Sequence, residues 1–357
     1  MIVVIADDFS GAAELAGIAA ARGFKAEVQT RFEPHPDVDV VAVDTATRLL
    51  DEREAARIVG ETARQIVAAK PAWIFKKTDS VLRGHIRAEI EAILSATGQK
   101  ESLFIPANPS KGRVIAGGRY LANGVPLDET VFANDPEHPR RSAVVRELLG
   151  NAPGIHTPDI GSTEAIRLEI AKLAPSTLPA GAADFFGELL GSTAAKMATR
   201  RITAERSLLV CGSAAAWETD RATQMKAEGF EVIVLPDESD PGRIDEDWLE
   251  RARGVLRVKT RLMLALGNPQ RVRSTSDLTD ALVQTALRVS EGLAGLRIAL
   301  ESGATALAFI RAKGWSRFDA IPEGMQGVGS LRPVGVADAP LLWVKPGSYP
   351  WPAGVFA

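Results

Sequence analysis

The sequence predicts an α/β protein of two domains, each with a mainly parallel sheet flanked by helices, and a ligand cleft between the two. Its 357 residues suit about two domains of ordinary size. Short apolar, β-rich runs alternate with amphipathic helical patterns, which is typical of βαβ units on a parallel sheet. The alternation begins at residue 2 and begins again near residue 205. We therefore expect domains at 1–200 and 201–357.

Composition excludes several function classes. With 46% hydrophobic and 24% charged residues, the chain has the balance of a soluble globular protein. A net charge of −3 gives no electrostatic case for binding nucleic acid or an anionic membrane. A single cysteine, Cys211, excludes an internal disulfide and fits a reducing cytoplasm. No signal-peptide pattern follows Met1, and no apolar run reaches the roughly 18 residues of a membrane span. We expect a cytoplasmic protein with no nucleic-acid or membrane partner, and a homodimer is compatible with the sequence.

The first half contains five strand-like runs, each bounded by turn residues or by a helical pattern. They are 2–6, 25–30, 38–44, 73–77 and 102–107. Helical patterns at 11–23, 51–70 and 87–94 lie between them. Ligands of such parallel sheets bind at the carboxyl ends of the strands.

The pattern breaks between residues 108 and 140, a stretch rich in Gly, Pro and Asn. Asn123-Gly124 is a strong signal for a hairpin turn. The stretch is too long for a simple connection in a compact domain, so we expect a functional insertion with its own hairpin. Helical patterns resume at Ser142, near Thr163 and around 184–200.

The second half repeats the alternation of strands and helices. Strand-like runs occur at 207–211, 231–236, 262–267, 296–300 and 341–344. Helical patterns occur at 245–253 and 276–295.

Polar clusters follow three strands of the first half, at residues 7–11, 44–48 and 76–84. Because the carboxyl ends of parallel strands share one edge of the sheet, the clusters are expected to line one crevice. An arginine's planar guanidinium suits a carboxylate or a phosphate, whereas an aspartate accepts hydrogen bonds from hydroxyls and can take a proton from an attacking alcohol.

A simpler interpretation exists for each cluster. Asp7, Asp8 or Ser10 can act only as an N-cap for the helix that follows, and Lys76 and Arg87 can be solvated. One cluster alone favours that interpretation. Three clusters of complementary charge on one edge favour a binding site.

The second half places Gly and hydroxyl residues at three strand ends: Gly212-Ser213, 302–305 and 345–348. Small residues there let backbone N–H groups and a helix N-terminus approach a phosphate. Singly, each is ordinary turn geometry; together they suggest a site for nucleotide phosphates.

Familiar motifs are absent from the sequence. There is no Walker-type P-loop, no dinucleotide-binding glycine fingerprint of a nicotinamide dehydrogenase, and no nucleophile elbow. The four histidines are scattered and cannot build a zinc site. We interpret His85 as a polar neighbour of a helix cap and Cys211 as a small buried hydrophobe.

Three collinear stretches resemble the four-carbon acid sugar kinases, the kinases of threonate, erythronate and 3-oxo-tetronate. They are ADDFSGAAELAG, KKTDSVLRGHIRAEIEAIL and PANPSKGRVIAGGRYLANGVPLDETVFANDPEHP, and they cover about the first 140 residues. The resemblance implies an N-terminal domain that binds the sugar acid and a C-terminal domain that binds ATP with Mg²⁺.

The resemblance also implies roles for particular residues. The substrate-binding residues are Asp8, Arg48, Lys77, Asp79, Ser80 and Arg83. Either Asp8 or Asp79 is then the catalytic residue that orients or deprotonates the attacking hydroxyl. The nucleotide-binding residues are Ser213, Ser302, Gly303, Ala304, Thr305 and Gly347.

The second half departs from the family pattern. Ala304 stands where the family has an acidic residue, and 348–351 replaces a Gly-Phe-Gly element. A lost carboxylate can remove a ligand of magnesium or water. The alternative function is therefore a sugar-acid-binding relative whose nucleotide site has eroded and whose kinase activity is small or absent.

Overall fold

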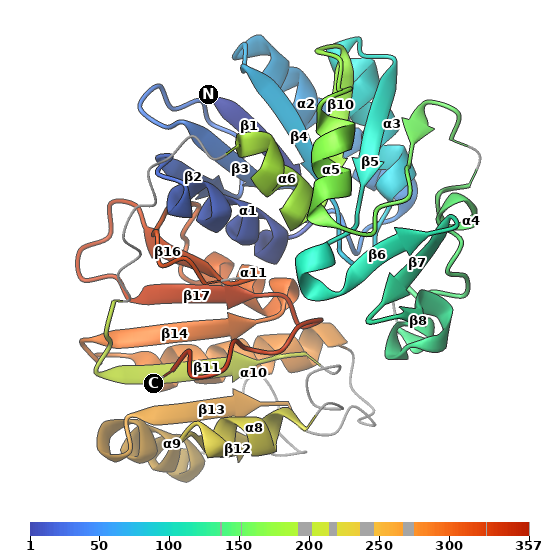
Figure 1. Cartoon of the computed structure of the whole chain (residues 1–357). Coiled ribbons are helices and arrows are strands. Elements are labelled where there is room, and N and C mark those ends of the chain that lie inside the picture. The colour runs from blue at the N-terminus through green and yellow to red at the C-terminus, as the bar shows by residue number, and fades with distance from the viewer. Residues whose placement is uncertain are drawn as a thin grey trace. The chain divides into compact units, whose positions relative to one another are not determined.

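The computed structural model describes residues 1–135, 138–150, 152–191, 202–213, 220–235, 246–266, 275–325 and 327–356. The chain forms two compact units, Met1–Met197 and Ala198–Ala357 (Figure 1). Each contains a mainly parallel sheet flanked by helices, which confirms the predicted α/β class. The boundary predicted between residues 200 and 201 lies outside the described residues, and the predicted ligand cleft stays a prediction.

The first unit is built on a parallel sheet with the strand order β2-β3-β1-β4-β10-β5-β9. The strands are β1 (Ile2–Ala6), β2 (Ala26–Gln29), β3 (Val40–Asp44), β4 (Trp73–Lys77), β5 (Glu101–Ile105), β9 (Ile155–His156) and β10 (Thr177–Gly181). Every residue of β2 and β3, and all but the first of β1 and β4, is buried. Burial along the whole strand is typical of parallel sheets that are covered on both faces.

The helices of this unit cover its sheet from both sides (Figure 1). They are α1 (Phe9–Ala21), α2 (Glu52–Ala68), α3 (Ile86–Thr97), α4 (Val145–Leu149), α5 (Thr163–Ile170) and α6 (Ala183–Leu190). Helix α1 packs with α6, and α2 packs with α3. Neighbouring residues of a strand point to opposite faces. At the end of β4, Lys76 accordingly contacts Glu89 on α3, whereas Lys77 contacts Glu14 on α1.

The insertion folds into a small antiparallel sheet, as predicted. It contains β6 (Arg113–Ala116), β7 (Arg119–Ala122), β8 (Val125–Pro126) and the short 3₁₀ helices η1 (Pro109–Lys111), η2 (Leu127–Glu129) and η3 (Val131–Asn134). Asn123 and Gly124 join β7 to β8 with φ values of 52° and 82°. Positive φ at both turn residues is what a two-residue hairpin of type I′ requires, and Asn-Gly supplies it at low cost.

The described part of the second unit has five parallel strands in the order β12-β13-β11-β14-β17, followed by β16 and β15, which pair antiparallel. The strands are β11 (Arg206–Cys211), β12 (Glu231–Val234), β13 (Arg261–Ala265), β14 (Leu296–Glu301), β15 (Arg317–Ala320), β16 (Gly329–Pro333) and β17 (Leu341–Lys345). The described helices are α8 (Arg221–Ala227), α9 (Glu246–Val258), α10 (Thr275–Ser290) and α11 (Gly303–Ala312). The sequence did not predict β15 or β16.

The end of the chain packs into the core of this unit. Trp351 and Phe356 have ring centroids 5.1 Å apart, and Phe356 lies 5.5 Å from Trp343 on β17 and 4.8 Å from Phe230. All four rings are buried. The residues after β17 are therefore part of the core.

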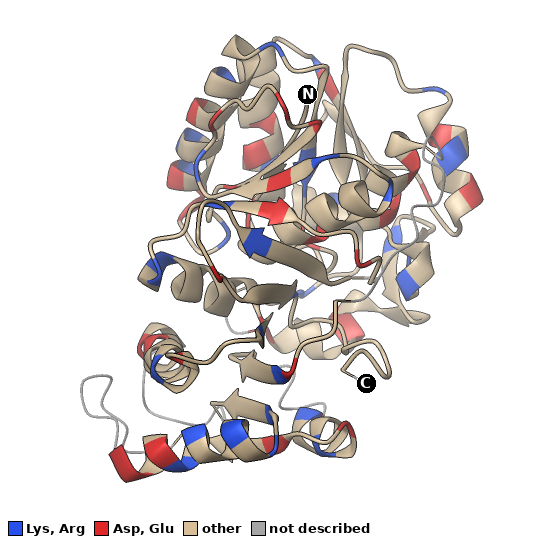
Figure 2. Cartoon of the chain, turned by 90° about the vertical axis from the view of Figure 1, so that its left-hand side faces the viewer, with Lys and Arg blue, Asp and Glu red and all other residues tan. Residues whose placement is uncertain are grey.

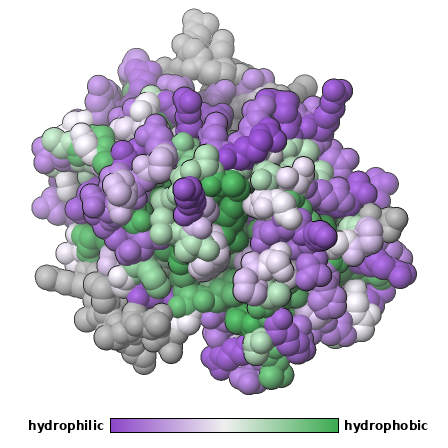
Figure 3. Space-filling model, turned by 90° about the horizontal axis from the view of Figure 1, so that it is seen from above, coloured by the Kyte–Doolittle hydropathy of each residue, from purple (hydrophilic) through white to green (hydrophobic). Residues whose placement is uncertain are grey.

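The surface carries both signs of charge. Figure 2 shows basic and acidic residues interspersed along the helices. The face in Figure 3 is mostly hydrophilic, with hydrophobic residues gathered near its middle. No helix in the described part of the chain is long and apolar enough to cross a membrane.

Candidate functional site

The three polar segments of the first unit follow adjacent strands. Strand β1 lies between β3 and β4, and its last residue, Ala6, is in register with Asp44 and with Lys77. The segments that leave these strands therefore start at one edge of the sheet. The contacts below show that their side chains meet.

Arg48 lies among three carboxylates. Its Nε is 2.7 Å from Asp7 Oδ2, and its Nη2 is 2.9 Å from both Asp7 Oδ1 and Asp8 Oδ1. Its Nη1 is 3.7 Å from Asp79 Oδ1. Burial disfavours the charged guanidinium, but the three aspartates outweigh burial and raise the pKa of Arg48 well above its ordinary value. Asp7, which belongs to the expected polar cluster 7–11 but was not among the predicted substrate-binding residues, is thus one of the main contacts of Arg48.

Asp79 and Arg83 form a bidentate ion pair. Arg83 Nε donates to Asp79 Oδ2 and its Nη2 to Oδ1, each at 2.9 Å. The backbone N–H groups of Val81 and Arg83 also donate to Oδ2, at 3.1 and 3.2 Å. Burial alone raises the pKa of Asp79, but Arg83 and Arg48 outweigh it and hold this pKa well below its usual range. Asp79 is therefore an ionised carboxylate that fixes two arginines.

Asp8 caps helix α1 as well as contacting Arg48. Its Oδ1 accepts a hydrogen bond from the Gly11 N–H at 2.9 Å, and its Oδ2 accepts one from Ser10 Oγ at 2.6 Å. A Cβ on Gly11 would lie 2.8 Å from Asp8 Oδ1 and 3.3 Å from Lys77 Cγ. The start of α1 thus needs glycine to lie this close to Asp8 and Lys77.

Lys77 belongs to a buried cluster that the sequence analysis missed. Its Nζ is 3.5 Å from Glu14 on α1, and Lys111 from the insertion lies 2.6 Å from the same carboxylate. Burial raises the pKa of Glu14, but Lys111 and Lys77 outweigh it and lower this pKa overall. One signal was available: Glu14 is the only charged residue in a helix of small and apolar residues.

The interpretation of Lys76 as a solvated residue was wrong. Its side chain is 1% exposed, and its Nζ lies 2.5 Å from Glu89, which also accepts a hydrogen bond from Thr47. Glu89 thus supplies the counter-charge of a lysine that is buried in the sheet.

Ser80 and the insertion meet through Tyr120. The Tyr120 hydroxyl donates to the backbone oxygen of Ser80 at 2.6 Å, and the nearby Thr78 Oγ1 is buried without a partner among the described residues. His138 Nε2 lies 2.8 Å from the Arg48 carbonyl oxygen. His85 occupies the N-cap of α3, but its ring contacts the Leu50 carbonyl oxygen instead of capping the helix.

The glycine and hydroxyl residues of the second unit also converge, because β11, β14 and β17 are adjacent. A Cβ on Gly212 would overlap Thr305 Oγ1, and one on Gly347 would overlap Ser213 Oγ. Thr305 Oγ1 is buried and has no hydrogen-bond partner among the described residues. Glycines let the backbone lie close to a bound group, and Thr305 offers an unsatisfied hydroxyl beside a helix N-terminus. Both features fit a phosphate group.

The remaining predicted nucleotide residues lie at the start of α11. Gly303 is the first residue of the helix, and Ala304 is exposed. Ser302 has φ 103°, a region that residues with a Cβ rarely adopt.

Glu301 is a buried carboxylate that the sequence analysis missed. Its Oε1 is 3.1 Å from Arg221 and 2.9 Å from Lys345, and its Oε2 accepts a hydrogen bond from Trp351 at 2.9 Å. These partners occupy the carboxylate, so it does not fit the role of a magnesium ligand here. Cys211 is buried as predicted, and burial raises its thiol pKa.

A family model and two curated relatives match part of the chain. A family model described as a sugar-binding N-terminal domain matches residues 2–218. D-erythronate kinase of Heliobacterium modesticaldum is 32% identical over 154 residues, which are 42% of this chain and 35% of that protein. D-threonate kinase of Salmonella typhimurium is 35% identical over 151 residues, which are 42% of this chain and 36% of that protein. These matches thus span about a third of the length of each kinase.

Other matches run over nearly the whole chain at lower identity. A 3-oxo-tetronate kinase of Methylobacterium radiotolerans is 24% identical over 404 aligned positions, covering 97% of this chain and 95% of that protein. A solved Salmonella typhimurium structure has a TM-score of 0.75 at 16% identity, covering 98% of this chain and 96% of that one. A solved Haemophilus influenzae structure has a TM-score of 0.68 at 17% identity, covering 98% and 97%. The two structures share the fold.

Proposed function

Because this chain belongs to the four-carbon acid sugar kinase family, we propose that it is an ATP-dependent kinase that phosphorylates the terminal hydroxyl of a four-carbon sugar acid. The substrate class is threonate, erythronate or 3-oxo-tetronate, as in the names of its relatives. The observation that carries the proposal is the meeting of Arg48, Arg83, Asp8 and Asp79 at adjacent strand ends.

The arginines supply the recognition of the substrate carboxylate. Aspartates already hold the Nε and Nη2 groups of Arg48 and Arg83, so each arginine would offer its Nη1 group and its positive charge to a substrate carboxylate. The contact between Arg48 and Asp79, at 3.7 Å, is longer than the other contacts of Arg48. A substrate carboxylate would replace Asp79 at Arg48, and the ion pair between Asp79 and Arg83 would persist.

Of the two aspartates, we assign Asp8 as the group that orients and deprotonates the attacking hydroxyl. A general base works best when its pKa is near the working pH, and the pKa of Asp79 is held far below it. Asp8 is also the more exposed, at 9% against 4%. Asp79 would then position Arg48 and Arg83.

The nucleotide would bind the second unit through Ser213, Gly347 and the start of α11. There the Thr305 hydroxyl would donate to a phosphate oxygen, and backbone N–H groups would surround it. Mg²⁺ would arrive with ATP and neutralise charge on its phosphates. Phosphoryl transfer needs little beyond such alignment and charge neutralisation.

The test is ADP release from Mg-ATP with D- and L-threonate, D- and L-erythronate and the 3-oxo-tetronates. Release with one of them, lost in Asp8→Asn, supports the kinase and names its substrate. If none of the acids leads to ADP release although each is shown to bind, the proposal of a kinase is rejected.

A second function is favoured by Ala304 and by the occupied Glu301. With Glu301 engaged by Arg221 and Lys345 and with Ala304 in place of a carboxylate, the chain would hold a sugar acid and transfer no phosphoryl group. Calorimetric titration separates the two functions, because a binder of this kind takes up the sugar acid and ignores Mg-ATP.

A further inference from the structure

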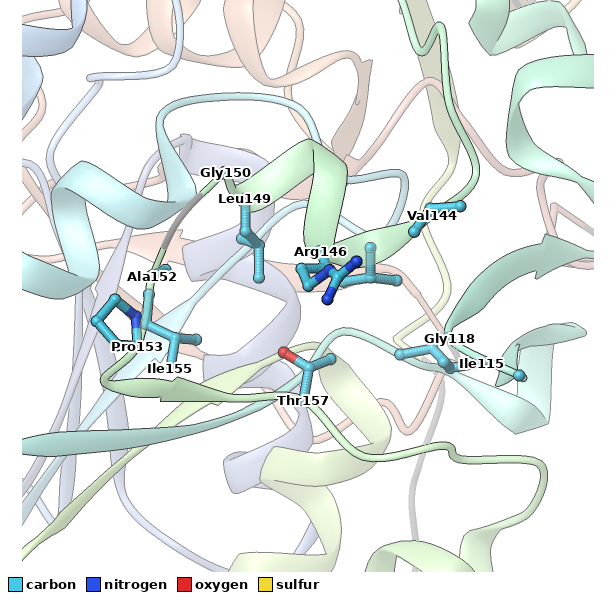
Figure 4. A pocket seen from close by; sticks show the side chains of 12 residues that line it. Ile115, Gly118, Val144, Arg146, Leu149, Gly150, Ala152, Pro153, Ile155 and Thr157 are labelled. Carbon is cyan, nitrogen blue, oxygen red and sulfur yellow. The ribbon is translucent and has the colours of Figure 1, made fainter.

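The first unit contains a cavity of about 790 Å³ whose lining shares no residue with the polar cluster described above. Three segments line it and leave it open to solvent on one side: the turn between β6 and β7, helix α4, and the chain around β9 (Figure 4). This volume is in the range of small-molecule sites, which hold a ligand on apolar walls with a few polar groups.

Hydrogen bonds among the three segments hold the cavity open. The N–H groups of Gly117 and Gly118 donate to the Asp159 carboxylate, at 2.7 and 2.9 Å. The Val145 N–H donates to the Gly118 carbonyl oxygen at 3.0 Å. The cavity is therefore formed before any ligand arrives.

Two polar groups face the cavity from opposite sides. Figure 4 shows the guanidinium of Arg146, from α4, and the hydroxyl of Thr157 pointing toward the space between them. Thr157 Oγ1 is buried and has no hydrogen-bond partner among the described residues. Leu149 and Ile155 provide apolar walls beside these groups.

We propose that this cavity binds a small organic monocarboxylate with a short apolar chain. One arginine and one hydroxyl match the charge and the two oxygens of a carboxylate. Among the described lining residues a phosphate dianion would meet one cation, Arg146, and the two glycine N–H groups that could help to bind it are already engaged by Asp159. The apolar walls suit an aliphatic chain, and the sugar acids of the proposed reaction, hydroxylated along their whole length, do not match them.

The test is isothermal titration of the full chain with hexanoate and with its neutral analogue hexanamide. Wild type is expected to bind hexanoate and to bind hexanamide at least about 10-fold more weakly, because the amide lacks the charge that Arg146 recognises. Arg146→Gln should weaken hexanoate binding about 10- to 100-fold. Arg141→Gln, an exposed arginine outside the lining, should leave it unchanged.

Three outcomes would overturn the proposal: no hexanoate binding by wild type up to about 10 mM, equal affinity in Arg146→Gln, or equal affinity for hexanamide. If Arg146→Gln does not fold, Thr157→Val tests the opposite side of the cavity and should also weaken hexanoate binding. The test does not depend on kinase activity, and turnover by Arg146→Gln is expected to equal that of wild type.

Discussion

The guanidinium of Arg83 meets the carboxylate of Asp79 through two parallel contacts of 2.9 Å, four residues along the loop between β4 and α3. Arg48 approaches the same carboxylate from the segment after β3. The charge packed into residues 76–83 is thus largely paired within the protein. It forms a network in which aspartates fix the positions of both arginines before any ligand binds.

The first prediction concerns stability against pH. The pKa of Asp79 is depressed in the folded state, so its contribution is fully present above the unfolded pKa of about 3.9 and is lost as pH falls through the folded value. We expect the free energy of unfolding to fall below about pH 5. Asp79→Asn should lower it by on the order of 2–3 kcal/mol at pH 7 and flatten its decline in acid.

Urea denaturation from pH 7 to pH 3 measures this effect. Asp37→Asn, an exposed aspartate, serves as the control and should follow wild type. An Asp79→Asn curve parallel to wild type would show that the network adds nothing to acid stability.

The second prediction separates the roles of the two aspartates. If Asp8 is the base, Asp8→Asn should lower kcat about 100- to 10,000-fold with a small change in the KM of the sugar acid. Asp79→Asn loosens Arg48 and Arg83, so it should raise that KM. Steady-state kinetics with the sugar acid that responds in the ADP assay decides, and the reverse pattern would assign the base to Asp79.

The third prediction concerns the buried pair of lysines at Glu14. Glu14→Gln removes the carboxylate that Lys77 and Lys111 share, which should cost about 3 kcal/mol of unfolding free energy. Glu54→Gln, which breaks an exposed pair with Arg57, is the matched control and should leave the midpoint of unfolding unchanged. Equal stability of the two variants would mean that solvent compensates the lysines.

Sequence patterns predicted most strands and the edge at which the polar side chains meet, because both follow from local periodicity and chain order. Strand β10 was not predicted, since Pro179 lies within it and proline cannot donate to a ladder. Pro179 is tolerated because β10 pairs with β4 only through Ala180 and Gly181.

Pairings between distant residues were beyond the sequence argument. The sequence allowed a solvated Lys76, but in the structure Lys76 is paired with Glu89 on the next helix. In the sequence, Glu301 is the last residue of an apolar strand. Its neighbours in the sequence do not predict its contacts with Arg221, Lys345 and Trp351. Such contacts depend on how elements pack, which a single sequence does not specify.

The fourth prediction concerns backbone strain at the start of α11. Ser302 has φ 103°, and a residue other than glycine that is held in such a region costs about 1–3 kcal/mol. Ser302→Gly should therefore raise the unfolding free energy by about 1 kcal/mol, since glycine adopts this φ freely but loses more entropy on folding. Denaturant titration measures it, and a destabilised variant would show that the Ser302 side chain makes contacts that outweigh the strain.

The fifth prediction tests the nucleotide site through one methyl-for-hydroxyl exchange. Thr305 Oγ1 is buried without a described partner, so Thr305→Val removes an unsatisfied group and should not destabilise the free protein. Thr285, equally buried, donates to the Ala281 carbonyl oxygen at 2.8 Å, and Thr285→Val should cost about 1 kcal/mol.

The affinity for Mg-ATP should depend on the other threonine: it should fall in Thr305→Val, the variant that keeps its stability. Thr305→Val should weaken it about 5- to 10-fold because the phosphate loses a donor, whereas Thr285→Val should leave it unchanged. Calorimetric titration of both variants, alongside their unfolding curves, gives the comparison. A Thr305→Val protein that keeps wild-type affinity for Mg-ATP would place the phosphates away from α11, and the close approach of Gly212 to Thr305 would then be a matter of packing alone.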